Sequence, residues 1–248
     1  MRRFLKTLPL SLALVLALAG LGLVLTSCNN GSQAQIRFVH AIYDAGQLDI
    51  EFNGAKEITD ITFGTVQPTS GYRPVPSGSI TVEGLQTGTT VEAFSTPNVN
   101  LSSGSEYTVV ATGNIGAVGN AVILADADDN AEPANGTINF RVINAAPNSP
   151  AAVDIFLVQT PLQGSACNGT PTVSSLAYQQ ASGYVNLPYN SNGEGYTMYV
   201  CVGGSLQFSG FPISVGSLSV GSIRTLILTN EANVQAMDSQ PIVLNDLN

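Results

Sequence analysis

Basic residues are scarce in this chain of 248 residues. Eight Lys and Arg stand against 17 Asp and Glu, and three of the eight, Arg2, Arg3 and Lys6, precede an uncharged apolar run. Beyond residue 27 five basic residues remain, which gives that part of the chain a formal charge of −12. A phosphate backbone or an anionic lipid headgroup is held by clusters of Lys and Arg. The sequence therefore predicts no nucleic-acid partner and no basic patch for anionic lipid.

Side chains that carry out catalysis are also few. His40 is the single histidine, and the sequence lacks the Gly-x-Ser-x-Gly elbow, the His-Glu-x-x-His zinc motif and a phosphate-binding glycine loop. His40 could act as a general base, but it follows Val39 in a strand-like segment, so we expect it to form hydrogen bonds at the strand end. Carboxylates from separate strands could still meet in space. We predict that the protein is not an enzyme and needs no cofactor.

The start of the chain is typical of a bacterial lipoprotein signal. A basic start and an apolar run lead to Leu-Thr-Ser-Cys at residues 25–28, which matches the lipobox. Residues 1–27 would be removed and Cys28 would carry the lipid that anchors the protein to the membrane. The alternative is an uncleaved signal anchor, because residues 7–26 are long enough for a bilayer core of ~30 Å. Either way, the remainder lies outside the cytoplasm, and Asn29 favours the outer membrane if the cell has two membranes.

Long segments with a helical stripe are absent, and short alternating segments take their place. Residues 48–52, 80–83 and parts of 107–112 alternate apolar and polar side chains, with Gly, Pro, Asn and Ser between such segments. This pattern predicts antiparallel β-sandwiches, and the length suffices for two. Residues 28–34 are small and polar, which predicts a flexible tether.

An internal repeat divides the rest of the chain. The matched segments, first copy and then second, are 36–41 with 140–145, 48–50 with 153–155, 70–76 with 182–188, 101–105 with 218–222, and 108–112 with 225–229. Apolar segments at 122–124 and 242–244 close the two copies. The sequence thus predicts one sandwich over residues 35–129, a linker over 130–136 and a second sandwich over 137–248.

These segments resemble a bacterial domain family of unknown function, DUF4397, whose members are exported and often carry the domain in tandem. Its opening motif, Arg-Val-x-His-Ala-Ser-Pro-Asp-Ala-Pro, is kept in part at residues 37–41, and residues 146–150 of the second copy are close to its last half. Asn144 stands where the second copy would have the histidine. The resemblance extends over nearly all of the chain beyond the signal and implies an immunoglobulin-like sandwich in an envelope protein. It implies no activity.

Cysteine usage agrees with export. With Cys28 assigned to lipid, Cys167 and Cys201 remain, both in the second copy, and an even number suits one disulfide in an oxidising compartment. Cys167 lies in a turn-rich insertion at 162–171 that the first copy lacks, so the disulfide would pin this insertion to a strand. A redox or metal site is the alternative, although the sequence contains no Cys-x-x-Cys.

The acidic segment between the two copies offers a weak metal candidate. Asp126, Asp128 and Asp129 have the oxygen ligands that Ca²⁺ prefers, but the segment lacks the Gly and Glu of an EF-hand loop. We therefore keep a loose calcium site between the copies as a possibility beside a solvated acidic linker.

Tyrosines raise the question of sugar binding, because five of them crowd the second copy: Tyr178, Tyr184, Tyr189, Tyr196 and Tyr199. Tyr72 and Tyr184 occupy matched positions, which favours packing with the hydroxyl at an edge. The prediction that the sequence supports best is a lipid-anchored pair of sandwiches that binds or holds an envelope protein. An envelope polysaccharide is the alternative ligand, and a cleft lined by several Tyr would favour it.

Overall fold

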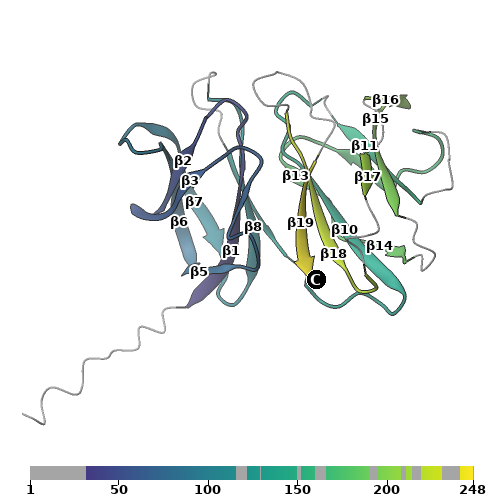
Figure 1. Cartoon of the computed structure of the whole chain (residues 1–248), viewed down its shortest axis with the longest axis horizontal. Helices are drawn as coiled ribbons and strands as arrows, with labels where there is room; N and C mark the ends of the chain where they lie inside the picture. The colour runs from purple at the N-terminus through teal and green to yellow at the C-terminus, as the bar shows by residue number, and fades with distance from the viewer. Residues whose placement is uncertain are drawn as a thin grey trace, which may run out of the picture. The chain divides into compact units, whose positions relative to one another are not determined.

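The computed structural model describes residues 32–115, 122–128, 130–149, 152–159, 166–189, 195–207, 211–213, 219–230 and 241–247. Residues 32–248 form one compact unit, and the described residues are all-β, as predicted (Figure 1). None of their segments is a helix long and apolar enough to cross a membrane. The predicted signal at 1–27 and the lipidation site Cys28 lie outside the described residues.

The first sandwich consists of two sheets. Sheet A has the order β4-β1-β8-β9, with β5 also paired to β1, and sheet B has the order β3-β2-β6-β7. Their strands are β1 (Gln33–Ala41), β2 (Leu48–Phe52), β3 (Ala55–Ile61), β4 (Val66–Gln67), β5 (Arg73–Pro76), β6 (Gly78–Gln86), β7 (Glu92–Leu101), β8 (Glu106–Thr112) and β9 (Val122–Ala127). Alternate residues of β6, such as Ile80 and Val82, are buried between the sheets, because successive side chains of a strand point to opposite faces.

The second sandwich repeats this topology. Sheet C has the order β13-β10-β18-β19, with β14 also on β10, and sheet D has the order β12-β11-β15-β16, with β17 also on β15. Their strands are β10 (Thr137–Asn144), β11 (Val153–Gln159), β12 (Val173–Leu176), β13 (Gln180–Ala181), β14 (Val185–Pro188), β15 (Tyr196–Val202), β16 (Ser205–Leu206), β17 (Phe211–Ile213), β18 (Ile223–Leu228) and β19 (Ile242–Leu247). Sheet order therefore agrees with the internal repeat.

Two details differ from the sequence prediction. Strand β1 begins at Gln33, and Ala34 is already buried in the core, so the tether predicted over 28–34 ends two residues too late. Each sandwich also contains one parallel pair, β1 with β8 and β10 with β18, although the pattern predicts antiparallel sheets. The chain visits the other sheet between β1 and β8, and a crossover of that kind allows two neighbours to run in the same direction.

Asp49 and Asp154, the central residues of the matched segments 48–50 and 153–155, each fix a bulge in the neighbouring edge strand. Asp49 Oδ1 accepts a hydrogen bond from the backbone N–H of Asp60 at 3.0 Å, and Asp154 Oδ1 accepts one from Ser175 at 2.8 Å. Asp60 and Ser175 both have positive φ, 55° and 52°, and the register shifts beside them. A bulge of this kind twists an edge strand away from further pairing, which explains why the aspartate recurs.

The disulfide predicted between Cys167 and Cys201 is present, with the two Cα atoms 5.7 Å apart. Cys201 is fully buried in β15, and the bond packs with Phe156 on the outer face of sheet D. It therefore attaches the described end of the insertion to a central strand of that sheet, as the sequence predicts.

Candidate functional site

Three arginines among the described residues are buried, and two of them, one in each sandwich, form ion pairs with buried aspartates. Arg37 on β1 and Arg141 on β10 occupy matched positions of the repeat, and their side chains are 4% and 1% exposed. A guanidinium can be buried only when carboxylates and further hydrogen-bond acceptors surround it. The partners of these two residues therefore define the site.

Each arginine is paired with the aspartate of the other sandwich. Arg37 Nη2 donates to Asp246 Oδ1 at 2.5 Å, and Arg141 Nη2 donates to Asp128 Oδ1. Asp128 follows β9 of the first sandwich and Asp246 lies on β19 of the second, and neither carboxylate side chain is exposed. Asp128 is also 3.5 Å from Arg37. Two positive and two negative charges thus meet across the boundary between the sandwiches, and the group has no net charge.

Threonine and tyrosine hydroxyls complete this group. Thr108 donates to Asp128 at 2.8 Å and Thr225 donates to Asp246 at 2.6 Å. Two further hydroxyls donate to the same carboxylates, Tyr72 to Asp128 at 2.7 Å and Tyr184 to Asp246 at 2.9 Å. We call the eight residues the crossed cluster: Arg37, Tyr72, Thr108, Asp128, Arg141, Tyr184, Thr225 and Asp246.

The tyrosine rings also shield the arginines. The Arg37 guanidinium lies 5.3 Å from the centre of the Tyr72 ring, and that of Arg141 lies 4.8 Å from the centre of the Tyr184 ring. Burial, together with the nearby carboxylates, raises the pKa of both phenols. Both hydroxyls therefore stay protonated and remain donors, and neither is suited to act as a base near neutral pH.

An apolar contact lies beside the crossed cluster, further along the same strands. Val39, Ala41 and Val110 of sheet A share one hydrophobic cluster with residues of sheet C, among them Ile143 and Ile227. Thr112 Oγ1 donates a hydrogen bond of 2.5 Å to the backbone carbonyl of Ala145 beside it. Sheets A and C thus pack against each other and lie between sheets B and D (Figure 1). The charged and hydroxyl groups of the crossed cluster bind one another rather than a ligand, so the contact between sheets A and C serves to join the two domains.

Sequence reasoning missed the arginines and Asp246 as site residues, although a signal for them exists. In a chain with so few basic residues, Arg37 and Arg141 are the two that recur at matched positions. The aspartates recur as well. In the ladders of β8 with β9 and of β18 with β19, Asp128 and Asp246 each lie two residues beyond the partner of the matched threonine.

The calcium candidate falls partly within this cluster. Asp128 accepts bonds from Arg141, Thr108 and Tyr72, so guanidinium groups stand where a cation would bind. The Asp126 side chain and Asp129 lie outside the described residues. Within the part of the chain that the structure describes, no group of three or more His, Cys, Asp or Glu side chains is placed to hold a metal. The calcium site stays a prediction.

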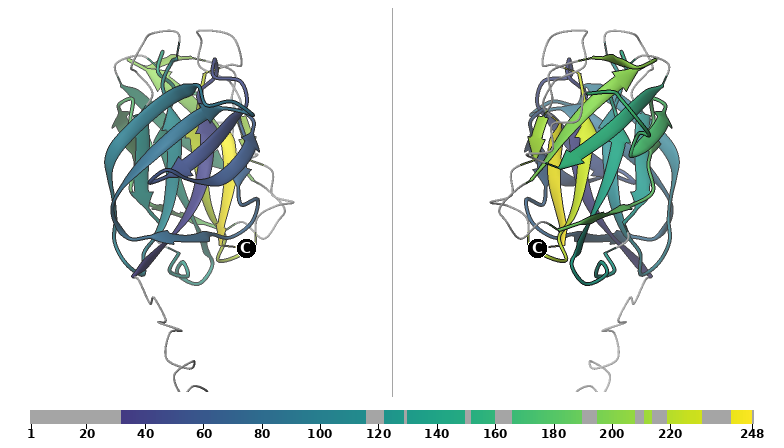
Figure 2. Two further views of the ribbon diagram at one scale, coloured as in Figure 1. Left: turned by 90° about the vertical axis from the view of Figure 1, so that its left-hand side faces the viewer. Right: turned by 90° about the vertical axis from the view of Figure 1, so that its right-hand side faces the viewer.

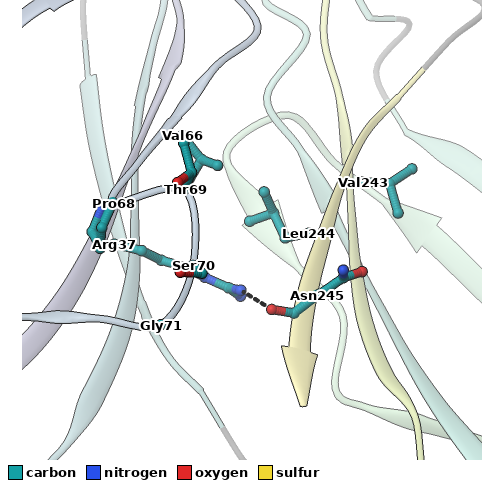
Figure 3. A pocket seen from close by; sticks show the side chains of 9 residues that line it. All are labelled: Arg37, Val66, Pro68, Thr69, Ser70, Gly71, Val243, Leu244 and Asn245. Atoms are coloured by element: carbon teal, nitrogen blue, oxygen red, sulfur yellow. Dashed lines mark hydrogen bonds between the residues drawn. The ribbon is translucent and has the colours of Figure 1, made fainter. Parts of the chain in front are cut away.

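A small cavity of about 100 Å³ lies beside the crossed cluster. It opens between the 66–71 segment of the first sandwich and β19, and Arg37 crosses it to donate to the backbone oxygen of Asn245 at 3.1 Å (Figure 3). Pockets for small molecules usually measure about 300–1,000 Å³. This cavity has room for a few water molecules and for no larger ligand.

His40 forms hydrogen bonds at the end of β1, as the sequence predicts. Its Nδ1 accepts from the N–H of Ile42 at 3.3 Å, and its Nε2 donates to the carbonyl of Gly46 at 2.8 Å. Asn144 forms the equivalent bond in the second sandwich, where its Oδ1 accepts from the N–H of Ala146, two residues further on, at 3.2 Å. Both residues are fully buried. This geometry supports the structural interpretation of the histidine, because both ring nitrogens are engaged.

We expect His40→Asn to be well tolerated and His40→Ala to cost about 1–3 kcal/mol, because alanine leaves the buried N–H of Ile42 without an acceptor. Burial lowers the pKa of His40 from 6.5. A lowered histidine pKa means that the unfolded chain binds the proton more readily, so this contribution is complete above pH 6.5 and is lost as the pH falls towards the folded pKa. Urea unfolding of wild type, His40→Asn and His40→Ala at neutral and mildly acidic pH measures both effects. A wild-type protein as acid-resistant as His40→Asn would contradict this assignment.

The tyrosines of the second sandwich are dispersed. Tyr184 belongs to the crossed cluster, and the hydroxyl of the buried Tyr196 donates to the carbonyl of Pro188 at 2.5 Å. Tyr189 packs on the core and Tyr199 on the disulfide, while the buried Tyr178 hydroxyl has no hydrogen-bond partner. The described residues thus contain no shared tyrosine platform of the kind that would favour sugar binding.

Comparison with known proteins agrees with the motif resemblance. Residues 34–156 match the model of the family described as Domain of unknown function (DUF4397). The match covers the first sandwich and continues through β10 and β11, so the resemblance is confirmed over this range rather than over nearly all of the chain beyond the signal. No curated protein matches the sequence.

Proposed function

We propose that this chain, which resembles the DUF4397 family over residues 34–156, is a non-catalytic module. Cys28 anchors it by lipid to the outer face of a membrane, and it binds an envelope protein with a basic surface. The crossed cluster supports the non-catalytic part, because the buried charged groups that recur in both copies hold the two sandwiches together. A joined pair of sandwiches can present a surface in a constant orientation to a partner.

The observation that carries the proposal is the placement of charge. All five basic residues beyond residue 27 lie in the described part of the chain. Arg37, Arg141 and Arg224 are buried, and the two that reach the surface are ion-paired, Lys56 with Asp49 and Arg73 with Glu57. The described surface therefore has acidic groups in excess, and it would attract a basic partner and repel an acidic one.

The outer face of sheet B is the best contact surface for such a partner (Figure 2, left). Glu51 on β2 stands directly opposite Glu83 on β6, and like charges at opposed positions destabilise a sheet. At the matched positions on sheet D, Phe156 stands opposite Tyr199, and both side chains pack on the disulfide. The first sandwich thus places two carboxylates side by side where the second keeps apolar contacts. Lys56 of β3 stands opposite Glu51 on its other side, and a basic partner would add a further attraction to the two carboxylates.

The experiment that tests the proposal is crosslinking in whole cells with the lipidated protein as bait and the Cys28→Ala form beside it. We expect one basic envelope protein to be enriched. Its recovery should fall several-fold in Glu51→Gln with Glu83→Gln and at raised salt, because screening weakens contacts between surface charges. Glu132→Gln, at an exposed position outside the sheets, is the matched control and should leave recovery unchanged. The proposal would be overturned if recovery of the partner changed neither with salt nor with the sheet B variants, or if no protein were enriched over the Cys28→Ala form.

A further inference from the structure

Each sandwich has a cleft at the side where the edges of its two sheets approach each other. In the first sandwich the cleft measures about 450 Å³ and is lined by Glu57 of β3, by Gln67 and Pro68, and by Arg73 and Pro74 of β5. In the second it measures about 360 Å³ and lies between β12 and the 180–185 segment. The two clefts occupy matched places of the repeat and can be compared residue by residue.

An ion pair bridges the first cleft. Arg73 donates both to the carboxylate and to the backbone carbonyl of Glu57 across it. The ladder positions assign Thr172 to the place of Glu57 and Val185 to the place of Arg73. Thr172 instead accepts a bond from the N–H of Leu157 at 3.0 Å, and valine has no polar group. The second cleft therefore lacks the bridge that occupies the first.

No charged side chain of a described residue lines the second cleft, whose walls combine polar residues with Val173, Leu176, Ala181 and Val185. Its polar lining residues are Thr172, Ser174, Ser175, Gln180, Ser182 and Tyr184. Among the described residues, the hydroxyls of Ser174 and Ser175 have no hydrogen-bond partner. A charged ligand would lose its hydration here without gaining a counter-ion, whereas a neutral ligand rich in hydroxyls could exchange hydrogen bonds with water for bonds to these groups.

Tyr184 is among the residues that line the second cleft, and its side chain is already fixed in position. The Arg141 guanidinium lies against the ring, and the hydroxyl is bound to Asp246. Binding to such a ring loses little conformational entropy. Tyr72 is held in the same way by Arg37 and Asp128, yet it does not line the first cleft. The second sandwich thus combines an open cleft, free hydroxyls and a lining tyrosine whose side chain is held in place.

We propose that the cleft between β12 and the 180–185 segment of the second sandwich binds a neutral saccharide. Its volume lies at the lower end of the usual range for ligand pockets, about 300–1,000 Å³, which suits a short stretch of a sugar chain. The cleft is separate from the outer face of sheet B, so saccharide binding can be tested independently of the proposed protein partner.

The test uses isotope-labelled residues 32–248, the compact unit. This protein is titrated with maltohexaose, cellohexaose and chitohexaose, and nuclear magnetic resonance monitors its amide signals. We expect at least one of these neutral sugars to shift the amide signals of Ser174, Ser175 and Gln180 at millimolar concentration. An anionic oligogalacturonide should shift them less, because the cleft holds no cation. A neutral Ser- and Thr-rich peptide is titrated in parallel as a probe for strand addition to β12.

Variants then locate the site. Thr172→Glu with Val185→Arg transfers the bridging ion pair of the first cleft and should weaken binding at least about tenfold, while Glu57→Thr with Arg73→Val in the first sandwich is the matched control and should not. Ser174→Ala, which leaves the backbone and the Leu157 bond intact, should also weaken binding, so that a misfolded double variant cannot decide the outcome alone. No shift with any of the three sugars, shifts outside the cleft, or stronger shifts with the peptide would overturn the proposal.

Discussion

Arg141→Ala should destabilise the protein by about 3–5 kcal/mol, the usual cost of removing one partner of a buried ion pair. The Asp128 side chain, which is not exposed, loses its direct cation, and the Tyr184 ring loses the guanidinium against which it lies. Arg37 remains 3.5 Å from Asp128, too far for a direct hydrogen bond. Urea unfolding followed by tyrosine fluorescence and circular dichroism measures the change.

Arg73→Ala is the matched control for this prediction. Arg73 is also an ion-paired arginine, but its side chain is 29% exposed, and pairs of that kind contribute about 0–1 kcal/mol. We further expect wild type to unfold in one transition and Arg141→Ala to show a lower midpoint, with the two sandwiches partly uncoupled. Equal effects of the two substitutions would show that the crossed cluster does not hold the sandwiches together.

Removal of the disulfide, through Cys167→Ala with Cys201→Ala, should cost about 3 to 4 kcal/mol. The bond closes a loop of 34 residues, so its loss enlarges the conformational freedom of the unfolded chain. It also leaves Phe156 and Tyr199 without the sulfur atoms that cover them on sheet D. Thermal unfolding measures the total, and amide exchange locates it: protection should fall further on β15 than on β6, its counterpart in the first sandwich.

Reduction of wild type provides the control for the disulfide variant. If the bond itself stabilises the second sandwich, a thiol reductant should lower the unfolding temperature of wild type to that of the double variant and leave the variant unchanged. A double variant with wild-type stability, or equal loss of protection on β6 and β15, would contradict the proposed role.

Local patterns predict much of this architecture. Alternating residues such as 48–52 specify which side chains face the core, because a strand exposes its two faces in turn. The repeat predicts that whatever the first sandwich forms, the second forms as well, and the sheet orders agree. With Cys28 assigned to lipid, Cys167 and Cys201 are the two cysteines that remain, and this even number predicts the disulfide. His40 and Asn144 also follow from matched positions at the ends of β1 and β10.

The sequence contains the residues of the crossed cluster but not their pairing. A repeat implies that Arg37 and Arg141 have equivalent surroundings, yet it does not say whether each finds the aspartate of its own copy or of the other. That choice depends on sheets A and C packing face to face, which brings together residues about two hundred positions apart, such as Arg37 and Asp246. The open cleft of the second sandwich has the same origin, because Thr172 and Val185 become its walls only when the edges of two sheets approach each other. Local periodicity thus determines strands, faces and repeats, whereas contacts between sheets depend on how whole surfaces fit and are decided by tertiary packing.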